Sequence, residues 1–342
     1  MSETILKVED LKTSFMTSSG EVQAVRGVSF EVHKGEILGI VGESGSGKSV
    51  TSMSILRLLA DTARIKNGKI EFEGTDLTKV SDKQMREIRG QKIAMVFQDP
   101  MSSLNPLIPV GKQVAEMIHV HHPEMKRDEL QAATLELFRE VRIPEAEKRL
   151  KSYPHEFSGG MRQRVVIAIA VACNPQILIC DEPTTALDVT IQAQILQLLK
   201  EMQVKYKLTI VLITHDLGVV ADIADRVAVM YAGDIVEIGT SDDIYYDPRH
   251  PYTWALLSSM PQMGIKGEDL FNIQGTPPNL FTEIHGDAFA PRNPQALKID
   301  FVKRPPYFTV SPTHKAKTWL LDPRAPKVEP PLAVKLLKEE GM

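Results

Sequence analysis

The stretch GESGSGKS at residues 42–49 constrains the fold of this chain more than any other feature. Three glycines and three serines fall within eight residues, and glycine inside a helix or strand costs about 0.5–1 kcal/mol relative to alanine. The apolar run KGEILGIVG leads into this stretch, and KSVTSMSILRLL, with helical spacing, follows it. A strand, a glycine loop and a helix in this order predict a phosphate-binding loop. In such a loop, backbone N–H groups and the positive end of the helix converge on phosphate oxygens.

The loop assigns roles to its own residues. In this pattern Lys48 reaches the β- and γ-phosphates of a nucleotide, and the hydroxyl of Ser49 binds Mg²⁺. The predicted nucleotide contacts are Gly42, Ser44, Gly45, Ser46, Gly47, Lys48, Ser49 and Val50. The alternative is a flexible Gly/Ser turn, but the strand before the loop and the helix after it favour the phosphate site.

A carboxylate pair follows a second apolar strand, in ILICDEP. Asp181 is predicted to hold Mg²⁺, often through water, and Glu182 to orient or deprotonate an attacking water. Alone, the pair could equally be a solvated loop. The phosphate loop upstream favours the catalytic interpretation.

The rest of the chain predicts an α/β protein. Alternating stretches at 4–41 and GKIEFEGTDL predict antiparallel strands, and helical patterns broken by prolines predict an inserted helical region at about 99–172. The strands 176–181 and 208–215, with a helix at 189–205 between them, predict a parallel sheet that a hairpin closes near residue 240. Beyond residue 260 lie 12 of the 22 prolines, which predicts a loop-rich extension.

Net charge, cysteine positions and apolar runs indicate which partners and which cellular location this chain can have. The formal charge of −4 argues against a nucleic-acid partner. The two cysteines, Cys173 and Cys180, lie in apolar runs and are predicted to be buried in a reducing compartment. The start MSETILKVED lacks a signal-peptide pattern, and no apolar run reaches 18 residues. These features predict a cytosolic chain that would work at a membrane only by docking onto another protein.

Five further features together resemble the ABC-type ATPases, over residues 4 to about 240. SGGMRQR (158–164) is similar to their signature sequence, Gln98 in VFQDP to their Q-loop, and ALD (186–188) to their D-loop. His215 in ITHD is similar to their switch histidine, and Phe15 to the aromatic residue that stacks on adenine. The resemblance implies a P-loop NTPase core with an antiparallel β subdomain and an inserted helical subdomain, and it implies ATP and Mg²⁺ as ligands.

The resemblance also implies roles in a dimer of ATPase domains. Ser158, Gly159 and Gly160 open a predicted helix, so they form a second anion-binding terminus. In the family this terminus covers the γ-phosphate held by a partner's phosphate loop. Asp188 would contact nucleotide there as well. FSGGM stands where LSGGQ is common, and neither Phe157 nor Met161 removes an anion-binding group.

Within one site, the resemblance implies that Gln98 touches Mg²⁺ or the attacking water and that His215 contacts the γ-phosphate. Phe15 could instead belong to the apolar core. The predicted catalytic residues are thus Lys48, Gln98, Glu182 and His215, and the predicted Mg²⁺ contacts, through nucleotide and water, are Ser49, Gln98 and Asp181.

Three stretches resemble the ATPase subunits of oligopeptide and dipeptide importers, a group that includes nickel and glutathione importers. They are residues 96–116, residues 153–190 and HPYTWALLSSMP (250–261). The resemblance implies an ATP-hydrolysing subunit on the cytoplasmic face of the membrane, bound to permease subunits and to a second, different ATPase chain. A peptide-binding protein would take part indirectly. Alternatives are a dipeptide, nickel or glutathione importer, a soluble ABC-type ATPase and a non-hydrolysing binding module.

The predicted domains are an ATPase domain at 1–240 and an extension at 241–342. In many relatives four cysteines of the extension hold an iron–sulfur cluster. Asp287, Asn293, Asp300 and Thr318 stand at those positions here, and such ligands are unsuited to iron–sulfur binding, so no cluster is predicted. Asp287 and Asp300 could form a hard-metal site or be solvated loop carboxylates.

Overall fold

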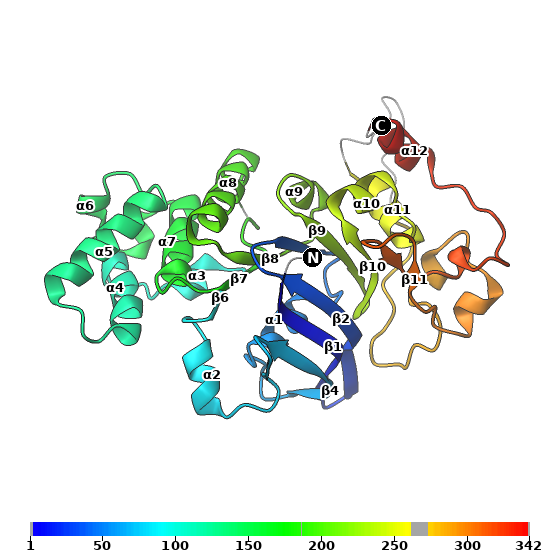
Figure 1. Cartoon of the computed structure of the whole chain (residues 1–342), viewed down its shortest axis with the longest axis horizontal. Coiled ribbons are helices and arrows are strands. Elements are labelled where there is room, and N and C mark those ends of the chain that lie inside the picture. The colour runs from blue at the N-terminus through cyan, green and yellow to red at the C-terminus, as the bar shows by residue number, and fades with distance from the viewer. Residues whose placement is uncertain (1–2, 186, 261–272, 341–342) are drawn as a thin grey trace. The chain divides into compact units, whose positions relative to one another are not determined.

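The computed structural model describes residues 3–185, 187–260 and 273–340. The chain divides into two compact units (Figure 1). The first comprises Met1–Lys79 together with Thr214–Met342, and the second comprises Val80–Ile213. The predicted extension therefore belongs to the same unit as the phosphate loop. The boundaries predicted near residues 240 and 99–172 stay predictions.

An antiparallel sheet opens the first unit, with strand order β2-β1-β4-β5. Its strands are β1 (Thr4–Thr17), β2 (Gly20–His33), β4 (Ala63–Phe72) and β5 (Thr75–Asp76). Apolar side chains such as Leu6, Val8 and Phe30 are buried, whereas their polar neighbours are exposed or half-buried. This alternation is the pattern that predicted strands here, and it places one face of the sheet on the core.

The phosphate loop leaves a buried strand of the first unit. Every residue of β3 (Ile37–Val41) is buried, and β3 runs parallel to β9 (Arg226–Tyr231). The helix α1 (Lys48–Ile55) follows the loop, as predicted. β9 continues into the antiparallel β10 (Asp234–Thr240).

The expectation that this hairpin closes the sheet is wrong. The two-residue strand β12 (Lys315–Ala316) pairs with β10, and β11 (Phe308–Thr309) pairs with β12. The extension therefore adds strands to the sheet that carries the phosphate loop.

The second unit contains parallel strands and a group of helices. β7 (Ile177–Asp181) lies between β6 (Ile93–Val96) and β8 (Thr209–Thr214), whose last residue belongs to the first unit. The helices are α2 (Asp82–Ile88), α3 (Pro100–Ser103), α4 (Val110–His121), α5 (Arg127–Glu140), α6 (Ala146–Arg149), η1 (Pro154–Glu156), α7 (Gly159–Val171) and α8 (Val189–Tyr206). Helices α3, α4 and α5 pack against α7 (Figure 1), and α8 forms the predicted crossover from β7 to β8.

The C-terminal part of the first unit is mostly irregular, as the prolines predicted. Its helices are α9 (Leu217–Ala221), α10 (Ser241–Tyr246), α11 (Pro251–Ser258), η3 (Ala290–Arg292), η4 (Lys298–Phe301), η5 (Trp319–Leu321) and α12 (Leu332–Glu340). Most of the motif at 250–261 lies in α11, which His250 caps, and Pro261 lies outside the described residues. In the described ranges, no helix is both long and apolar enough to cross a lipid bilayer.

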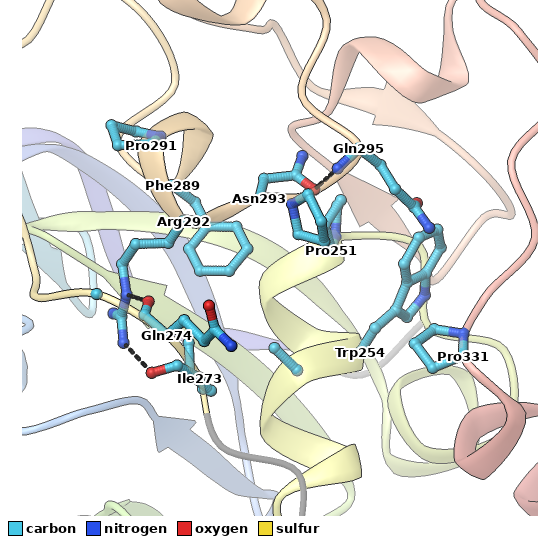
Figure 2. A pocket seen from close by; sticks show the side chains of 13 residues that line it. Pro251, Trp254, Ile273, Gln274, Phe289, Pro291, Arg292, Asn293, Gln295 and Pro331 are labelled. Carbon is cyan, nitrogen blue, oxygen red and sulfur yellow. Dashed lines mark hydrogen bonds between the residues drawn. The ribbon is translucent and has the colours of Figure 1, made fainter.

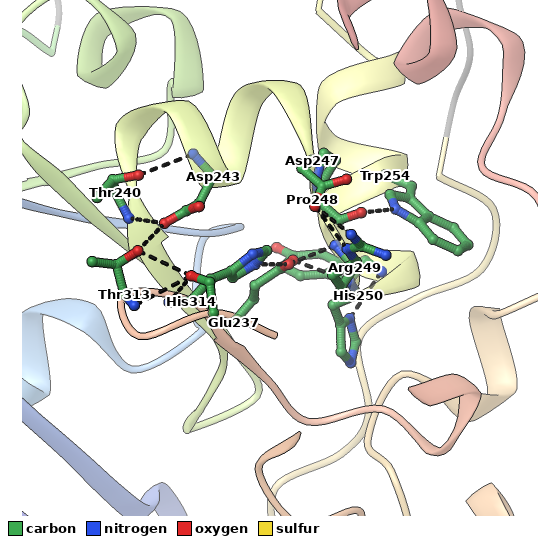
Figure 3. A network of polar contacts seen from close by, with 12 residues as sticks. Glu237, Thr240, Asp243, Asp247, Pro248, Arg249, His250, Trp254, Thr313 and His314 are labelled. Atoms are coloured by element: carbon green, nitrogen blue, oxygen red, sulfur yellow. Dashed lines mark hydrogen bonds and ion pairs between the residues drawn. The ribbon is translucent and has the colours of Figure 1, made fainter. Parts of the chain in front are cut away.

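A buried carboxylate ties the extension to β10 (Figure 3). The side chain of Glu237 is fully buried and accepts hydrogen bonds from the backbone N–H groups of Arg249, at 2.5 Å, and His250, at 3.1 Å. Nε2 of His314 lies 2.8 Å from the same carboxylate. Glu237 thus joins the loop before α11 and the turn between β11 and β12 to one strand, and these bonds satisfy its buried charge.

The four positions that resemble lost cysteine ligands are all buried, and each accepts a backbone hydrogen bond close by in sequence. Asp287 accepts from Phe289 N at 2.9 Å, Asn293 from Gln295 N at 2.9 Å, Asp300 from Leu297 N at 2.6 Å and Thr318 from Leu320 N at 3.3 Å. Oxygen acceptors at these positions stabilise turns. The expectation of solvated loop carboxylates is therefore wrong, because Asp287 and Asp300 are buried within the extension.

Asp287→Asn is expected to stabilise the extension at neutral pH. Burial raises the pKa of Asp287 to about 6, and the negative charge of Asp234 adds to that increase. The folded protein then keeps a proton that the unfolded chain, with a pKa of about 3.9, has lost. Stability therefore falls as the pH rises from about 4 to 6. Asparagine can keep the turn bond without the charge, so we expect a gain of about 2 kcal/mol at pH 7.5 that shrinks towards pH 4.

Urea unfolding followed by tryptophan fluorescence measures this gain, because both tryptophans, Trp254 and Trp319, lie in the extension. Asp322→Asn is the matched control: its carboxylate pairs with Arg324, and this pair lowers the pKa of Asp322. A gain for Asp287→Asn that does not change with pH would contradict the assignment of a buried, charged carboxylate.

Candidate functional site

The phosphate loop is folded around its own lysine. Lys48 is only 4% exposed, and its Nζ donates to Gly42 O at 2.7 Å and to Glu43 O at 2.9 Å. A Cβ at Gly42 would lie 2.0 Å from Met230 O, and a Cβ at Gly47, where φ is +100°, would lie 2.4 Å from Ala24 O. Only glycine fits at these two positions, which explains the composition of the loop. An ammonium group and the start of α1 thus lie together in the first unit, as an anion site requires.

The remaining loop residues fit the same site. Ser46 is buried, and its carbonyl accepts a hydrogen bond from Gly233 N at 2.8 Å, which fixes the loop to the turn between β9 and β10. Ser44 and Gly45 are exposed at the tip of the loop, and Ser49 and Val50 lie half-buried in the first turn of α1.

Phe15 lies on β1, opposite Val22 and Ala63, and its side chain is half-buried. A hydrogen bond of 3.0 Å between the hydroxyls of Thr13 and Ser54 joins this strand to α1. Phe15 therefore belongs to a strand that contacts the helix of the phosphate loop, and its contact with adenine stays a prediction.

The carboxylate pair lies at the end of β7 in the second unit. Asp181 is 2% exposed and pairs with Ile213 of β8. Glu182 has φ +47°, a conformation that non-glycine residues rarely adopt, and its N–H donates to Ile213 O at 2.9 Å. Such strain is typical of functional sites and requires a surrounding structure that holds it.

The structure brings together two predicted catalytic residues that lie 84 positions apart. Gln98 Nε2 donates to Glu182 Oε2 at 3.0 Å. Thr185 Oγ1 donates to the same oxygen at 2.9 Å. Glu182 is therefore oriented by an amide and a hydroxyl, and its second carboxylate oxygen makes neither of these bonds. Sequence reasoning missed Thr185, although it lies in the DEPTT stretch.

The signature residues form an exposed helix start. The hydroxyl of Ser158 accepts a hydrogen bond from Met161 N at 3.3 Å and caps α7, and both Ser158 and Gly159 are exposed. Gly160 is buried, and a Cβ there would lie 2.5 Å from Ile191 Cγ2 of α8. Asp188 is exposed and caps α8 by accepting from Ile191 N at 3.0 Å. Two helix starts thus lie side by side at Gly160. Ala186 of the D-loop lies outside the described residues.

The predicted site residues divide between the two units. Lys48, Ser49 and the exposed His215, which follows β8, belong to the first unit, and Gln98, Asp181, Glu182, Ser158 and Asp188 belong to the second. Hydroxyl, amide and carboxylate oxygens suit Mg²⁺. That these residues form one magnesium and nucleotide site stays a prediction.

Two family models match the chain. The model described as "ABC transporter" matches residues 25–185, and the model described as "Oligopeptide/dipeptide transporter, C-terminal region" matches residues 236–299. The first match contains the phosphate loop, the signature residues and the carboxylate pair, and the second contains α11 and much of the extension.

Characterised relatives match nearly the whole chain. The oligopeptide transport ATP-binding protein OppD of Bacillus subtilis is 59% identical over 333 residues, which are 97% of this chain and 93% of that protein. The dipeptide transport ATP-binding protein DppD of Lactococcus lactis is 55% identical, over 96% of this chain and 94% of that protein.

Solved structures match the larger part of the chain. The ATP-binding cassette MJ0796, solved as a dimer in a post-hydrolysis state bound to ADP and Pi, is 28% identical with a TM-score of 0.62, over 69% of this chain and 98% of that chain. CbiO1 from Clostridium perfringens, part of the transporter complex cbiONQ, is 29% identical with a TM-score of 0.62, over 72% of this chain and 92% of that chain.

Proposed function

The chain belongs to the family of ABC transporter ATP-binding proteins, and from that premise we propose that it hydrolyses ATP to energise oligopeptide uptake across the cytoplasmic membrane. The predicted α/β core of the P-loop NTPase type is confirmed by its solved relatives. The observation that carries the proposal is the 59% identity with an oligopeptide transport ATP-binding protein, which extends through the phosphate loop and the extension. This match favours an oligopeptide importer over a soluble ABC-type ATPase.

In the proposed reaction a water oxygen attacks the γ-phosphorus of ATP, and the bond to the oxygen that bridges the β- and γ-phosphates breaks. The products are ADP and inorganic phosphate. Glu182, held by Gln98 and Thr185, orients the water and accepts its proton, and His215 contacts the γ-phosphate. Lys48 and the loop N–H groups bind the β- and γ-phosphates. Mg²⁺, bound through Ser49, Asp181 and Gln98, would neutralise phosphate charge.

We propose that the nucleotide is closed in by a second ATPase chain, which contributes its own signature residues. The exposed Ser158 and Gly159 support this arrangement, because a capped helix start in solvent offers N–H groups and a hydroxyl to a phosphate. A solved dimer of a related cassette is consistent with it. ATP would favour the closed pair by contacts that the open pair lacks. We propose that this second chain is a different ATPase, as the resemblance to peptide importers implies.

We propose that permease subunits dock on the region around the Q-loop residue Gln98. Phe97 is 39% exposed, Met101 58% and Leu107 83%, within eleven residues of one unit. These exposed apolar side chains support a surface for protein association in this part of the chain. Permease subunits docked there would place the chain on the cytoplasmic face of the membrane. A movement of Gln98 would then be transmitted to these subunits. A peptide-binding protein on the other face would act through the permease.

Purification of the chain with its companions from native membranes, followed by reconstitution in vesicles, tests this proposal. We expect permease subunits and a second ATPase chain to copurify, and phosphate release to rise when oligopeptide and the binding protein are added. Parallel assays with dipeptide, nickel and glutathione report the carried solute. Phosphate release that ignores every peptide, or a chain that purifies without membrane companions, would overturn it.

A further inference from the structure

Arg292 of the extension forms an ion pair with Glu43 of the phosphate loop. Arg292 Nη1 lies 2.6 Å from Glu43 Oε2, and its Nη2 lies 3.0 Å from Glu43 Oε1. Arg292 ends η3, 249 positions after Glu43, the second residue of the loop. The arginine side chain is 5% exposed and the glutamate side chain 26%. A pair with a buried arginine and two parallel hydrogen bonds has a defined geometry, unlike a flexible surface ion pair.

Further contacts fix both members of this pair. The backbone N–H of Glu43 donates to the hydroxyl of Tyr252 in α11 at 2.9 Å. Arg292 Nη1 also donates to the hydroxyl of Tyr231 at 3.2 Å, and its guanidinium lies 5.9 Å from the ring centroid of Phe289. The rings of Tyr231, Tyr252 and Phe289 pack together, with centroids 4.5–5.3 Å apart.

The other face of Arg292 is held by the segment before η3. Its Nε donates to Gln274 O at 3.0 Å and its Nη2 to Ile273 O at 3.3 Å, as Figure 2 shows. Arg292 lines a cavity of about 810 Å³ there, together with Phe289 and Trp254. With these bonds added to those with Glu43, all three guanidinium nitrogens donate hydrogen bonds.

Glu43 connects this cluster to the lysine of the loop. Its carbonyl oxygen accepts from Lys48 Nζ at 2.9 Å, while its carboxylate is bound by Arg292. Glu43 thus connects Lys48, the predicted phosphate contact, to Arg292 of the extension. Without Arg292, Glu43 would lose the two hydrogen bonds that fix its side chain, and the loop carbonyl that contacts Lys48 would lose that support.

We propose that Arg292 is a positioning residue for the phosphate loop, so that the C-terminal extension sets the affinity of the loop for ATP. The inference rests on the proposed nucleotide site at Lys48. It gives the extension a role in the ATPase itself, in addition to any contact with other subunits.

A double-mutant cycle on the purified full chain tests this inference. Arg292→Gln, Glu43→Gln and the double variant are compared with wild type by the Kd for MgATP. Each single variant should weaken binding by about tenfold, and the double variant by about the same factor, since both changes remove one interaction. Arg292→Lys should fall in between, because lysine keeps the charge but loses the fork. In the assembled transporter, KM for ATP should rise while kcat stays near wild type.

Arg324→Gln is the matched control. Arg324 also belongs to the extension and binds both oxygens of a carboxylate, that of Asp322, at 2.8 Å, but its side chain is 85% exposed. It should leave the Kd unchanged. An unchanged Kd in folded Arg292→Gln, or effects of the single variants that multiply in the double variant, would overturn the inference. Failure of the wild type to bind MgATP would instead refute the proposed nucleotide site.

If Arg292→Gln does not fold, hydrogen exchange on the wild type and Glu43→Gln decides the question. Because coupling is reciprocal, MgATP should slow backbone exchange at residues 287–295 of the wild type. In Glu43→Gln this protection should be lost. Absence of the effect in the nucleotide-bound wild type, or its persistence in Glu43→Gln, would overturn the inference.

Discussion

Glu182→Gln is expected to retain ATP binding while ATP turnover falls by roughly 10²–10⁴-fold, the usual contribution of a general base. The fold should survive, because the amide oxygen of glutamine can accept the hydrogen bonds that Gln98 and Thr185 donate to Glu182. The backbone bond from residue 182 to Ile213 O is also unaffected. Only the ability to accept a proton from water is lost. Phosphate release and the Kd for MgATP, measured on the same preparation, separate the two effects.

Glu201→Gln provides the control for Glu182→Gln. Glu201 lies on α8 of the same unit, and its carboxylate pairs with Arg142 at 2.7 Å in an exposed position. Its replacement should leave turnover within twofold of wild type, because exposed ion pairs contribute at most about 1 kcal/mol to stability. Turnover near the wild-type rate in Glu182→Gln would refute the role of Glu182, whereas loss of ATP binding would show that the side chain supports the site and not the chemical step.

The local features of the nucleotide site could be predicted from the sequence because each depends on neighbouring residues. A buried strand, a run of glycines and a helical pattern lie within 20 residues, so β3, the loop and α1 followed from the pattern alone. At Gly42 and Gly47 the structure confirms that a side chain does not fit, because a Cβ atom there would clash with a main-chain oxygen.

Contacts between distant residues could not be predicted in this way. Nothing around Arg292 indicates that its partner is Glu43, because an arginine in a proline-rich stretch has no periodic pattern to place it. The two-residue strands β11 and β12 are too short to show alternation, so the pairing of β12 with β10 was missed. The burial of Asp287 could not be predicted either, because it depends on residues distant in the sequence, such as His250, whose Nε2 lies 3.9 Å from the Asp287 carboxylate.

The extension emerges as a structural part of the ATPase unit. The backbone N–H of His250 binds Glu237 of β10, and the side chain of Arg292 binds Glu43 of the phosphate loop. The extension is thus joined to the sheet and to the loop by bonds between residues distant in the sequence. Its four buried turn acceptors give it order without cysteines. Through the contact between Arg292 and Glu43, the stability of the extension is coupled to the geometry of the phosphate loop.

Ser158→Ala is expected to leave ATP binding to the isolated chain intact and to weaken ATP-dependent closure of the ATPase pair by about thirtyfold. In the proposed closed pair the hydroxyl binds a phosphate held by the other chain, and a hydrogen bond to a charged group contributes about 2 kcal/mol. The measurement is ATP-dependent association of the two ATPase subunits in the Glu182→Gln background, where slow hydrolysis preserves the closed state.

The capping role of Ser158 must be separated from this contact. Ser158 also caps α7, and loss of an N-cap costs about 1 kcal/mol of stability in any helix. Ser81→Ala removes a matched cap, because the hydroxyl of Ser81 accepts from Gln84 N at 3.3 Å at the start of α2 in the same unit. If closure depends on the phosphate contact, Ser81→Ala should lower the melting temperature without affecting association. Equal losses of association in the two variants would mean that helix stability, and not a contact between chains, explains the effect.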